Sequence, residues 1–467
     1  MQPLGSQKAS AYYPAISRGS PRLFFLLPNC HMNRLLLRSS SWALLLGLLT
    51  LLACTRQEES DPQPSTYSYM VYASYRPLLM ARATLESSVA AVAPQALHNT
   101  GKIYVRGTYV FVNEKYEGIH VIDNRDPANP RPVSFLRIPG NVDLAVRGNL
   151  LYADNGPDLV TIDISNPAQA QLAGRVRNAF REVPMPELGP LEEAYQPSKR
   201  PANAVVVGWH KLTADEVIPY QVTYPMYQTW GPIFYSAASA TSPTLSANAG
   251  TGKGGSLARF AIVGQTLYTV DESSLQVFDL QNPALPVAGK VVSLGFGIET
   301  IFPQDHYLFL GTQSGMYIYD VAAPAAPQRV AFYQHMVSCD PVVVDGRYAY
   351  VTLRTGRTCG GGIANVLEVI DLANLSRPAL VRSYPMTNPG GLGVENNRLY
   401  VCDDGLKVFD TSKTPALTQL QHFSTTITDV IPNGNYLLAI GPGGLYQYRV
   451  GGPSLQQVSL LPISPAR

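Results

Sequence analysis

The hydrophobic residues of this chain fall into short runs that recur along the sequence. In the first complete copy, an apolar run at 103–105 precedes a turn at Gly107, a second run carries Phe111, and a third ends at Asp123 before Pro127. Runs of this length, separated by Gly, Asn, Asp and Pro, are typical of β-strands joined by tight turns. Since almost no segment has helical periodicity, the pattern predicts an all-β chain.

The same unit aligns seven times from residue 102 onward. In six copies the third strand ends in an aspartate, and in the seventh Tyr448 aligns with that position. The aspartates are Asp123, Asp163, Asp279, Asp320, Asp371 and Asp410. Apart from one long interval, they lie 39 to 51 residues apart. Four antiparallel strands in roughly 40 residues, repeated along a chain, are typical of β-propeller blades.

We therefore predict a β-propeller with seven four-stranded blades over residues 102–463. A solenoid of the same repeats is the alternative, but a solenoid needs polar capping repeats at its ends. The last copy, 429–462, is as apolar as the others, which favours a closed ring.

The repeated aspartates could serve the fold or a ligand. A carboxylate at a strand end can accept the amides of the following turn, and the proline behind it stops strand pairing at the edge. The motif falls at the outer turn of each blade, so these carboxylates would point away from any shared site. We predict that they are structural.

One interval breaks the repeat, because Asp163 and Asp279 are 116 residues apart. Two degenerate blades or one insertion could fill it. We predict an insertion at 181–256, in which a strand near Val205 could extend the outer edge of blade 2. The glycine-rich run at its end resembles a P-loop only superficially, because Lys253 is followed by Gly and not by Ser or Thr. We expect a mobile loop there.

The N-terminal region has the pattern of an export signal. Arg34 and Arg38 precede a short apolar core that ends at Ala53, directly before Cys54. The core is too short for a transmembrane helix. Residues 32–53 therefore resemble a bacterial lipoprotein signal peptide with Cys54 as the lipidation site. A signal anchor with an unrelated cysteine is the alternative.

The flanking segments follow from this assignment. We expect translation to start at Met32, with residues 1–31 not translated. Residues 54–65 are polar and would form a flexible tether. In the segment 66–101 we expect a strand at 67–72 and a short helix at 77–93, packed on the outside of the propeller.

Three cysteines remain in the predicted propeller. Cys339 opens the first strand of blade 5, and Cys359 lies in the enlarged loop after its second strand. These two positions fall at the same end of an antiparallel blade, and disulfides persist in an envelope compartment. We predict a Cys339–Cys359 disulfide and a free, partly buried thiol at Cys402. A zinc site is less favoured, because no His accompanies the pair at ligand spacing.

The insertion, the blade-5 loop and the starts of the first strands should share one rim. Polar residues at these places are Asn141, Asp143, Glu299, Asp340, Arg354, Arg357 and Asp429. Converging carboxylates near a central channel could hold a cation or a polar ligand. We favour the other interpretation, in which they cap strand ends and bind water. Asp143, Asp340, Arg354 and Asp429 are the candidate site residues. No cofactor is predicted, and a channel-bound cation is the alternative.

Composition and motifs restrict the function classes. With 35 basic and 33 acidic residues, the chain lacks the basic surface of a nucleic-acid binder. It carries neither the repeated Asp-box turns of sialidases nor the Trp-rich docking motifs of quinone-dependent dehydrogenases. No Gly-x-Ser-x-Gly elbow occurs in strand-to-helix context, and the histidines are dispersed. A metal-assisted hydrolase or lactonase remains open, because such a site needs no linear motif.

Several strands resemble the LVIVD repeat. These are IHVID at 119–123, LVTID at 159–163 and LEVID at 367–371. The resemblance covers about residues 100–450 and extends to CDPVVV at 339–344, a stretch that such proteins often carry. It implies a β-propeller that is often exported and lipid-anchored, and it implies no activity.

We therefore expect a monomeric, lipid-anchored propeller of the cell envelope, attached to the outer membrane. It would bind an envelope protein or glycan through its loop-rich face and would not be an enzyme. The metal-assisted hydrolase is the alternative.

Overall fold

This computed structural model describes residues 66–71, 73–186, 191–217, 220–225, 252–335, 341–355, 365–452 and 454–464. All of them belong to one compact unit, Thr66–Arg467. In this part of the chain, no helix has the length and apolar character needed to span a membrane. The predictions for residues 1–31, the signal peptide, Cys54 and the tether lie outside it.

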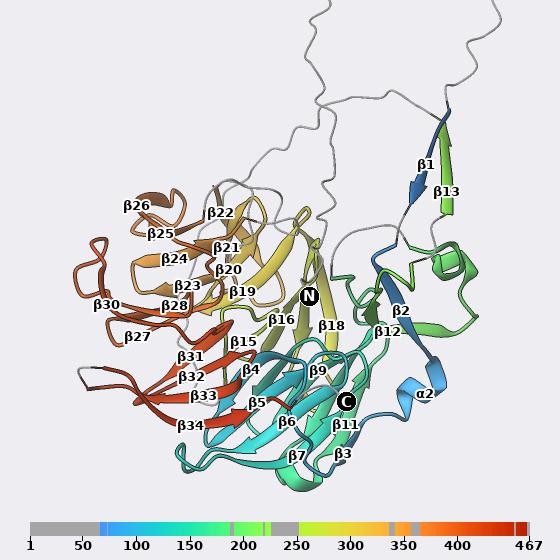
Figure 1. Cartoon of the computed structure of the whole chain (residues 1–467), viewed down its shortest axis with the longest axis horizontal. Coiled ribbons are helices and arrows are strands. Elements are labelled where there is room, and N and C mark those ends of the chain that lie inside the picture. Colours follow the sequence, from blue (N-terminus) through green and yellow to red (C-terminus); the bar gives the residue numbers. More distant parts are fainter. Residues whose placement is uncertain are drawn as a thin grey trace, which may run out of the picture. The chain divides into compact units, whose positions relative to one another are not determined.

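The unit is a seven-bladed β-propeller of four-stranded antiparallel blades, as predicted (Figure 1). Blades 1 to 3 comprise β4 (Thr100–Arg106), β5 (Tyr109–Glu114), β6 (Gly118–Asp123) and β7 (Arg131–Arg137); β8 (Leu144–Arg147), β9 (Leu150–Asn155), β10 (Asp158–Asp163) and β11 (Gln171–Val176); and β15 (Phe260–Val263), β16 (Thr266–Val270), β17 (Ser274–Asp279) and β18 (Val287–Ser293). Blades 4 and 5 comprise β19 (Ile298–Gln304), β20 (Tyr307–Thr312), β21 (Gly315–Asp320) and β22 (Gln328–Gln334); and β23 (Val342–Asp345), β24 (Tyr348–Leu353), β25 (Val366–Asp371) and β26 (Ala379–Pro385). Blades 6 and 7 comprise β27 (Leu392–Glu395), β28 (Arg398–Cys402), β29 (Leu406–Asp410) and β30 (Thr418–Phe423); and β31 (Asp429–Asn433), β32 (Tyr436–Gly441), β33 (Gly444–Arg449) and β34 (Gln456–Pro462).

The ring closes between blades 7 and 1, which excludes the solenoid. The first strands contact one another in a complete cycle, because β31 of blade 7 packs against β4 of blade 1. Ile431 and Leu438 share a buried apolar cluster with Ile103 and Val112. A parallel bridge between Leu97 and Ile463 further ties the N-terminal segment to the last blade.

The repeated aspartates are structural, as predicted. In all six copies one carboxylate oxygen accepts the backbone N–H two residues later, at 2.7–3.1 Å. This is an Asx turn, which ends the third strand and starts the turn to the fourth. In blade 7 the strand ends at Arg449, so Arg449 rather than Tyr448 occupies the aspartate position.

The aromatic residue of the second strand joins neighbouring blades. Tyr152 donates a hydrogen bond to the Pro283 carbonyl at 2.8 Å, and Tyr268 donates one to the Pro324 carbonyl at 3.0 Å. Each acceptor lies in the proline turn of the next blade. The two conspicuous features of the repeat, the aromatic and the proline turn, are therefore partners across the blade interface.

We expect Tyr152→Phe to lower the free energy of unfolding by about 1 kcal/mol, the net contribution of one buried hydrogen bond. The phenyl ring should fit without repacking, because Phe111 and Phe309 fill the same position in blades 1 and 4. Denaturant unfolding followed by circular dichroism measures the change. A loss above about 3 kcal/mol would indicate that packing rather than the hydrogen bond is affected.

The N-terminal segment is mostly extended. It contains β1 (Thr66–Val71), β2 (Tyr75–Ala81) and β3 (Ala90–Val92), and its helix, α2 (Arg82–Glu86), is shorter than the predicted 77–93. Pro77 lies within β2, where its fixed φ and missing N–H are tolerated in a two-stranded ribbon. The segment packs on blades 1 and 2, since β3 pairs with β7 and Arg82 forms a salt bridge with the buried Asp158.

The insertion pairs mainly with this N-terminal segment. Its strand β12 (Ala204–Lys211) pairs with β2, and β13 (Tyr220–Pro225) pairs with β1. The suggestion that this strand extends blade 2 is therefore wrong. β11 has β10 as its partner, whereas β12 is held by a strand that precedes the propeller.

The predicted mobile loop at the end of the insertion is instead an inner strand. β14 (Lys253–Gly254) pairs antiparallel with β4, the innermost strand of blade 1. Glycine is required here by space, because a Cβ on Gly252 would lie 2.1 Å from Tyr104 Cε1. The Lys253 ammonium donates hydrogen bonds to Glu395 Oε1 at 3.1 Å and to the Pro432 carbonyl at 2.9 Å. The run thus links the first blade to the last two.

Candidate binding face

The strand directions place the starts of the first strands and the loops after the second strands on one rim, as expected. Asp143 and Asp429 open β8 and β31, and Arg354 follows β24. Asp340, Arg357, Cys339 and Cys359 lie outside the described residues, so the disulfide stays a prediction. We call this rim the candidate face.

Asp143 is buried, and the charge of its carboxylate is balanced by the Lys102 ammonium. Its carboxylate accepts the Lys102 ammonium at 2.7 Å and the Leu144 amide at 2.7 Å. The Arg259 amide is a further donor. Burial lowers the pKa of Lys102, while the neighbouring Asp143 acts in the opposite direction. Such a fully satisfied pair crosslinks blades 1, 2 and 3 and leaves little capacity for a ligand.

Asp429 faces the glycine-rich run rather than solvent. One of its oxygens accepts Ser256 Oγ at 3.2 Å and the Val430 amide at 3.0 Å. Within the described residues its other oxygen has no hydrogen-bond partner. Burial raises the pKa of Asp429 to about 7. The run therefore packs directly against this carboxyl, since a Cβ on Gly255 would lie 2.0 Å from Asp429 Oδ2.

Arg354 lies in a different part of the candidate face. It lines a cavity of about 430 Å³ above blades 5 to 7, together with Glu299 and Cys402. Cys402 has a free thiol, as predicted, but it is fully rather than partly buried. Burial raises the pKa of this thiol, which therefore stays protonated and unreactive. Arg354 thus lines a cavity that neither Asp143 nor Asp429 lines, whereas the Lys102 ammonium pairs with Asp143 and also acts on Asp429.

A second cavity, of about 360 Å³, lies between blades 2 and 3 beneath the insertion. The insertion contributes Glu182, Val183 and Trp209 to its wall, and blade 3 contributes Arg259 and Glu272. The indole of Trp209 donates to the Val183 carbonyl at 2.8 Å, which fixes this wall. Cavities of this size can hold a single side chain or sugar residue. We call it the insertion cavity.

The most perturbed group of the insertion cavity, Asp154, was not predicted from the sequence. One carboxylate oxygen accepts the amides of Val142 and Asp143, at 2.8 and 3.0 Å, and the Asn141 side chain at 2.7 Å. Burial outweighs these donors and raises the pKa of Asp154 to about 7. A signal was available, since Asp154 follows the repeat aromatic by two residues, where blades 3 and 4 have Val270 and Gly311.

An exposed aromatic side chain lies at the edge of the insertion cavity. Phe296 is 61% exposed, although it lines the cavity. Gly295 and Gly297 on either side adopt φ values of 108° and 82°, which side-chain-bearing residues rarely accept. This backbone presents the ring to solvent, and exposed aromatic rings are frequent anchors of protein and sugar partners.

The described part of the chain contains no group of three or more His, Cys, Asp or Glu side chains that could hold a metal ion. The carboxyl groups of Asp143 and Asp154 are instead held by protein donors. A channel-bound cation therefore stays an untested alternative that would depend on residues such as Asp340.

Comparisons with known proteins identify one repeat family. The LVIVD repeat family matches residues 140–178 and 338–386. A comparison with curated proteins finds no significant match.

Solved structures that match the chain at low sequence identity include the following two. The periplasmic gluconolactonase PpgL of Pseudomonas aeruginosa is 13% identical over 78% of this chain and 98% of its own, with a TM-score of 0.48. BamB of Moraxella catarrhalis is 9% identical over 79% of this chain and 89% of its own, with a TM-score of 0.42. On its own strand topology and the family match, the chain is a seven-bladed β-propeller that carries LVIVD repeats.

Proposed function

We propose that this protein is a lipid-anchored propeller of the cell envelope that binds a protein or glycan partner at its candidate face without chemical turnover. The proposed location rests on the signal-like segment 32–53 and on Cys54, which would tether the propeller to the outer membrane. The blades form a rigid scaffold, and the segments that interrupt the repeat supply the contact surface.

One observation carries the proposal: the insertion forms the wall of a cavity on the candidate face. Trp209 and Val183 are buried against each other there, and Phe296 is exposed beside them. An ordered cavity next to an exposed aromatic ring suits a partner that inserts one group and covers the ring. Asp143, by contrast, is engaged with Lys102 and backbone amides, so it supports the blades and not chemistry.

We expect Phe296→Asp to reduce capture of the partner from envelope extracts by at least about fivefold, the effect of losing one interface anchor. The fold should be unaffected, because the ring is exposed. Leu380→Asp is the matched control: Leu380 is 47% exposed on β26 of blade 5, outside the cavity. Protease treatment of the extract separates the two partner classes, since it removes a protein partner and leaves a glycan. Equal capture by both variants and the unchanged chain would contradict the proposal.

The metal-assisted hydrolase or lactonase remains the second candidate because of Asp154. A carboxyl group with a pKa of about 7 in a cavity can donate or accept a proton near neutral pH. This candidate would be supported if turnover of an ester or lactone disappeared in Asp154→Asn.

A further inference from the structure

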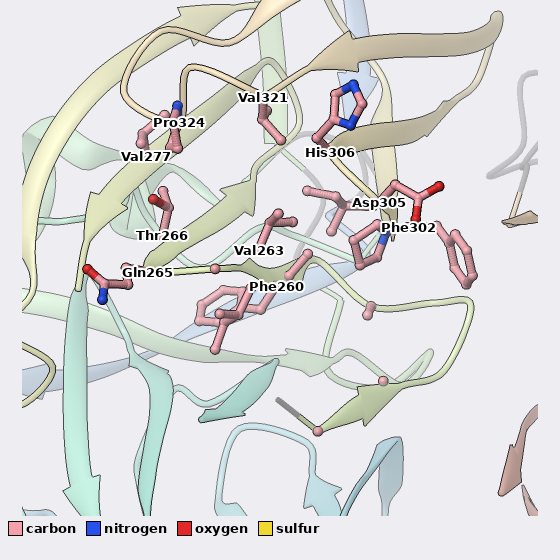
Figure 2. A pocket seen from close by; sticks show the side chains of 18 of the residues that line it. Phe260, Val263, Gln265, Thr266, Val277, Phe302, Asp305, His306, Val321 and Pro324 are labelled. Carbon is pink, nitrogen blue, oxygen red and sulfur yellow. The ribbon is translucent and has the colours of Figure 1, made fainter. Parts of the chain in front are cut away.

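The rim opposite to the candidate face contains a larger cavity, of about 770 Å³ (Figure 2). It opens between blades 3 and 4, where the turns after the first strands are located. Figure 2 shows Val277, Val321 and Pro324 on one side and Val263 and Phe260 on the other. These side chains give the cavity an apolar part, and its volume is that of a small-molecule site. We call it the lower cavity.

The lower cavity contains carboxylates without basic partners. Asp279 and Asp305 both line it. Asp279 accepts the Gln281 amide at 2.8 Å, and neither aspartate has a salt bridge among the described residues. Two cationic or titratable groups also line the cavity, but the Lys253 ammonium is paired with Glu395, and the His306 ring packs on Tyr307 at 4.1 Å.

Blade 5 shows where a cation can lie beside a repeat carboxylate, at a position that is Asn149, His306 and Asn397 in blades 2, 4 and 6. In blade 5, Arg347 accepts the amide of Leu372 through its carbonyl and places its guanidinium on the repeat carboxylate Asp371, with Nε 2.8 Å from Oδ1. In blade 3 the same backbone bond joins Leu280 to Gln265. Gln265 therefore occupies the position of the arginine without its charge.

We propose that the lower cavity binds a small apolar molecule that carries a protonated amine. The apolar part would lie against Val263, Val277 and Val321, and the ammonium would occupy the place beside Asp279 that a guanidinium occupies in blade 5. Asp305 also lines the cavity, at the other end from Gln265 in Figure 2. Apolar burial supplies the affinity and the carboxylate selects the charge.

Three matched probes test the charge selection on the full chain. Phenethylamine, 2-phenylethanol and phenylacetate share one ring but carry positive, zero and negative charge at pH 7. Isothermal titration calorimetry should rank their affinities in that order. Asp279→Asn should weaken the amine about threefold and leave the alcohol unchanged, because one exposed ion pair contributes up to about 1 kcal/mol. The asparagine retains the carbonyl oxygen that accepts the turn amide, so the fold is preserved.

A second variant tests whether the ammonium of the ligand lies beside Asp279. Gln265→Arg restores the arginine of blade 5 and should reduce amine binding at least as much as Asp279→Asn, by competition for the carboxylate. Asp371→Asn, the equivalent change in blade 5, should have no effect on any probe. The proposal is overturned if the three probes bind equally or not at all, or if both blade-3 variants bind the amine like the unchanged chain. Phe296→Asp should not alter these results, so the two proposals can fail separately.

Discussion

Replacing Gly255 by valine should lower the free energy of unfolding by about 3 kcal/mol, the upper end of overpacking effects in a closed interior. A Cβ at this position would lie 2.0 Å from Asp429 Oδ2, which is itself buried. Relief would require the run to move away from blade 7. That movement would disrupt the bond from the Leu392 amide to Ser256 Oγ, which is 2.9 Å long. Guanidinium unfolding followed by circular dichroism measures the loss.

Gly390→Ala is the control for this substitution. Gly390 lies at the start of blade 6, near Thr428 of blade 7. The atom nearest to a Cβ added there would be the Thr428 carbonyl oxygen at 3.4 Å, which is an ordinary contact. We expect a change within about 0.5 kcal/mol, as for substitutions away from packed contacts. If Gly255→Val were equally neutral, the glycine-rich run would not be held between blades 1, 6 and 7, and the predicted mobile loop would regain support.

The blade architecture could be predicted because each of its causes is local. The Asx turn needs only the aspartate and the amide two residues later, and the hairpins need Gly, Asn or Asp at fixed places. Ring closure could be predicted because the last copy of the repeat is apolar, whereas a solenoid would end in a polar capping repeat. Tyr448 was aligned with the aspartates, one residue before the correct Arg449, because Arg449 lacks the carboxylate that marks the other copies.

From the sequence, the rim that carries the candidate site could be predicted, but the contacts within the site could not. Asp143 was correctly placed on the candidate face, but its partner Lys102 is 41 residues away in the chain, and no local pattern joins them. The glycine-rich run was misjudged for the same reason, since its partners are β4, Glu395 and Asp429. Glycine there reflects the closeness of Tyr104, which is visible only after the ring has formed.

The second large effect concerns pH. Between pH 5 and pH 8, Asp429→Asn should gain about 3 kcal/mol of stability relative to the unchanged chain. Burial raises the pKa of Asp429 to about 7 in the folded protein, whereas an unfolded aspartate titrates near pH 4. Over this window the folded state therefore binds more protons than the unfolded state, and the stability of the unchanged chain falls as the pH rises. Asparagine has no proton to lose, so the difference between the two unfolding curves isolates this one group.

Asp371→Asn is the control that separates the pH dependence due to Asp429 from the effect of removing a carboxylate in general. The Arg347 guanidinium lowers the pKa of Asp371 to about 2, so Asp371 is ionised in both states from pH 5 to pH 8. The difference in stability between this variant and the unchanged chain should therefore be independent of pH across the window.

Parallel curves for Asp429→Asn as well would mean that Asp429 is ionised at neutral pH in the folded protein. A buried charge of that kind would need a counter-ion at its unpartnered oxygen, which is the condition for the channel-bound cation. The same titration thus decides between a neutral acid that packs against the glycine-rich run and a carboxylate that holds an ion.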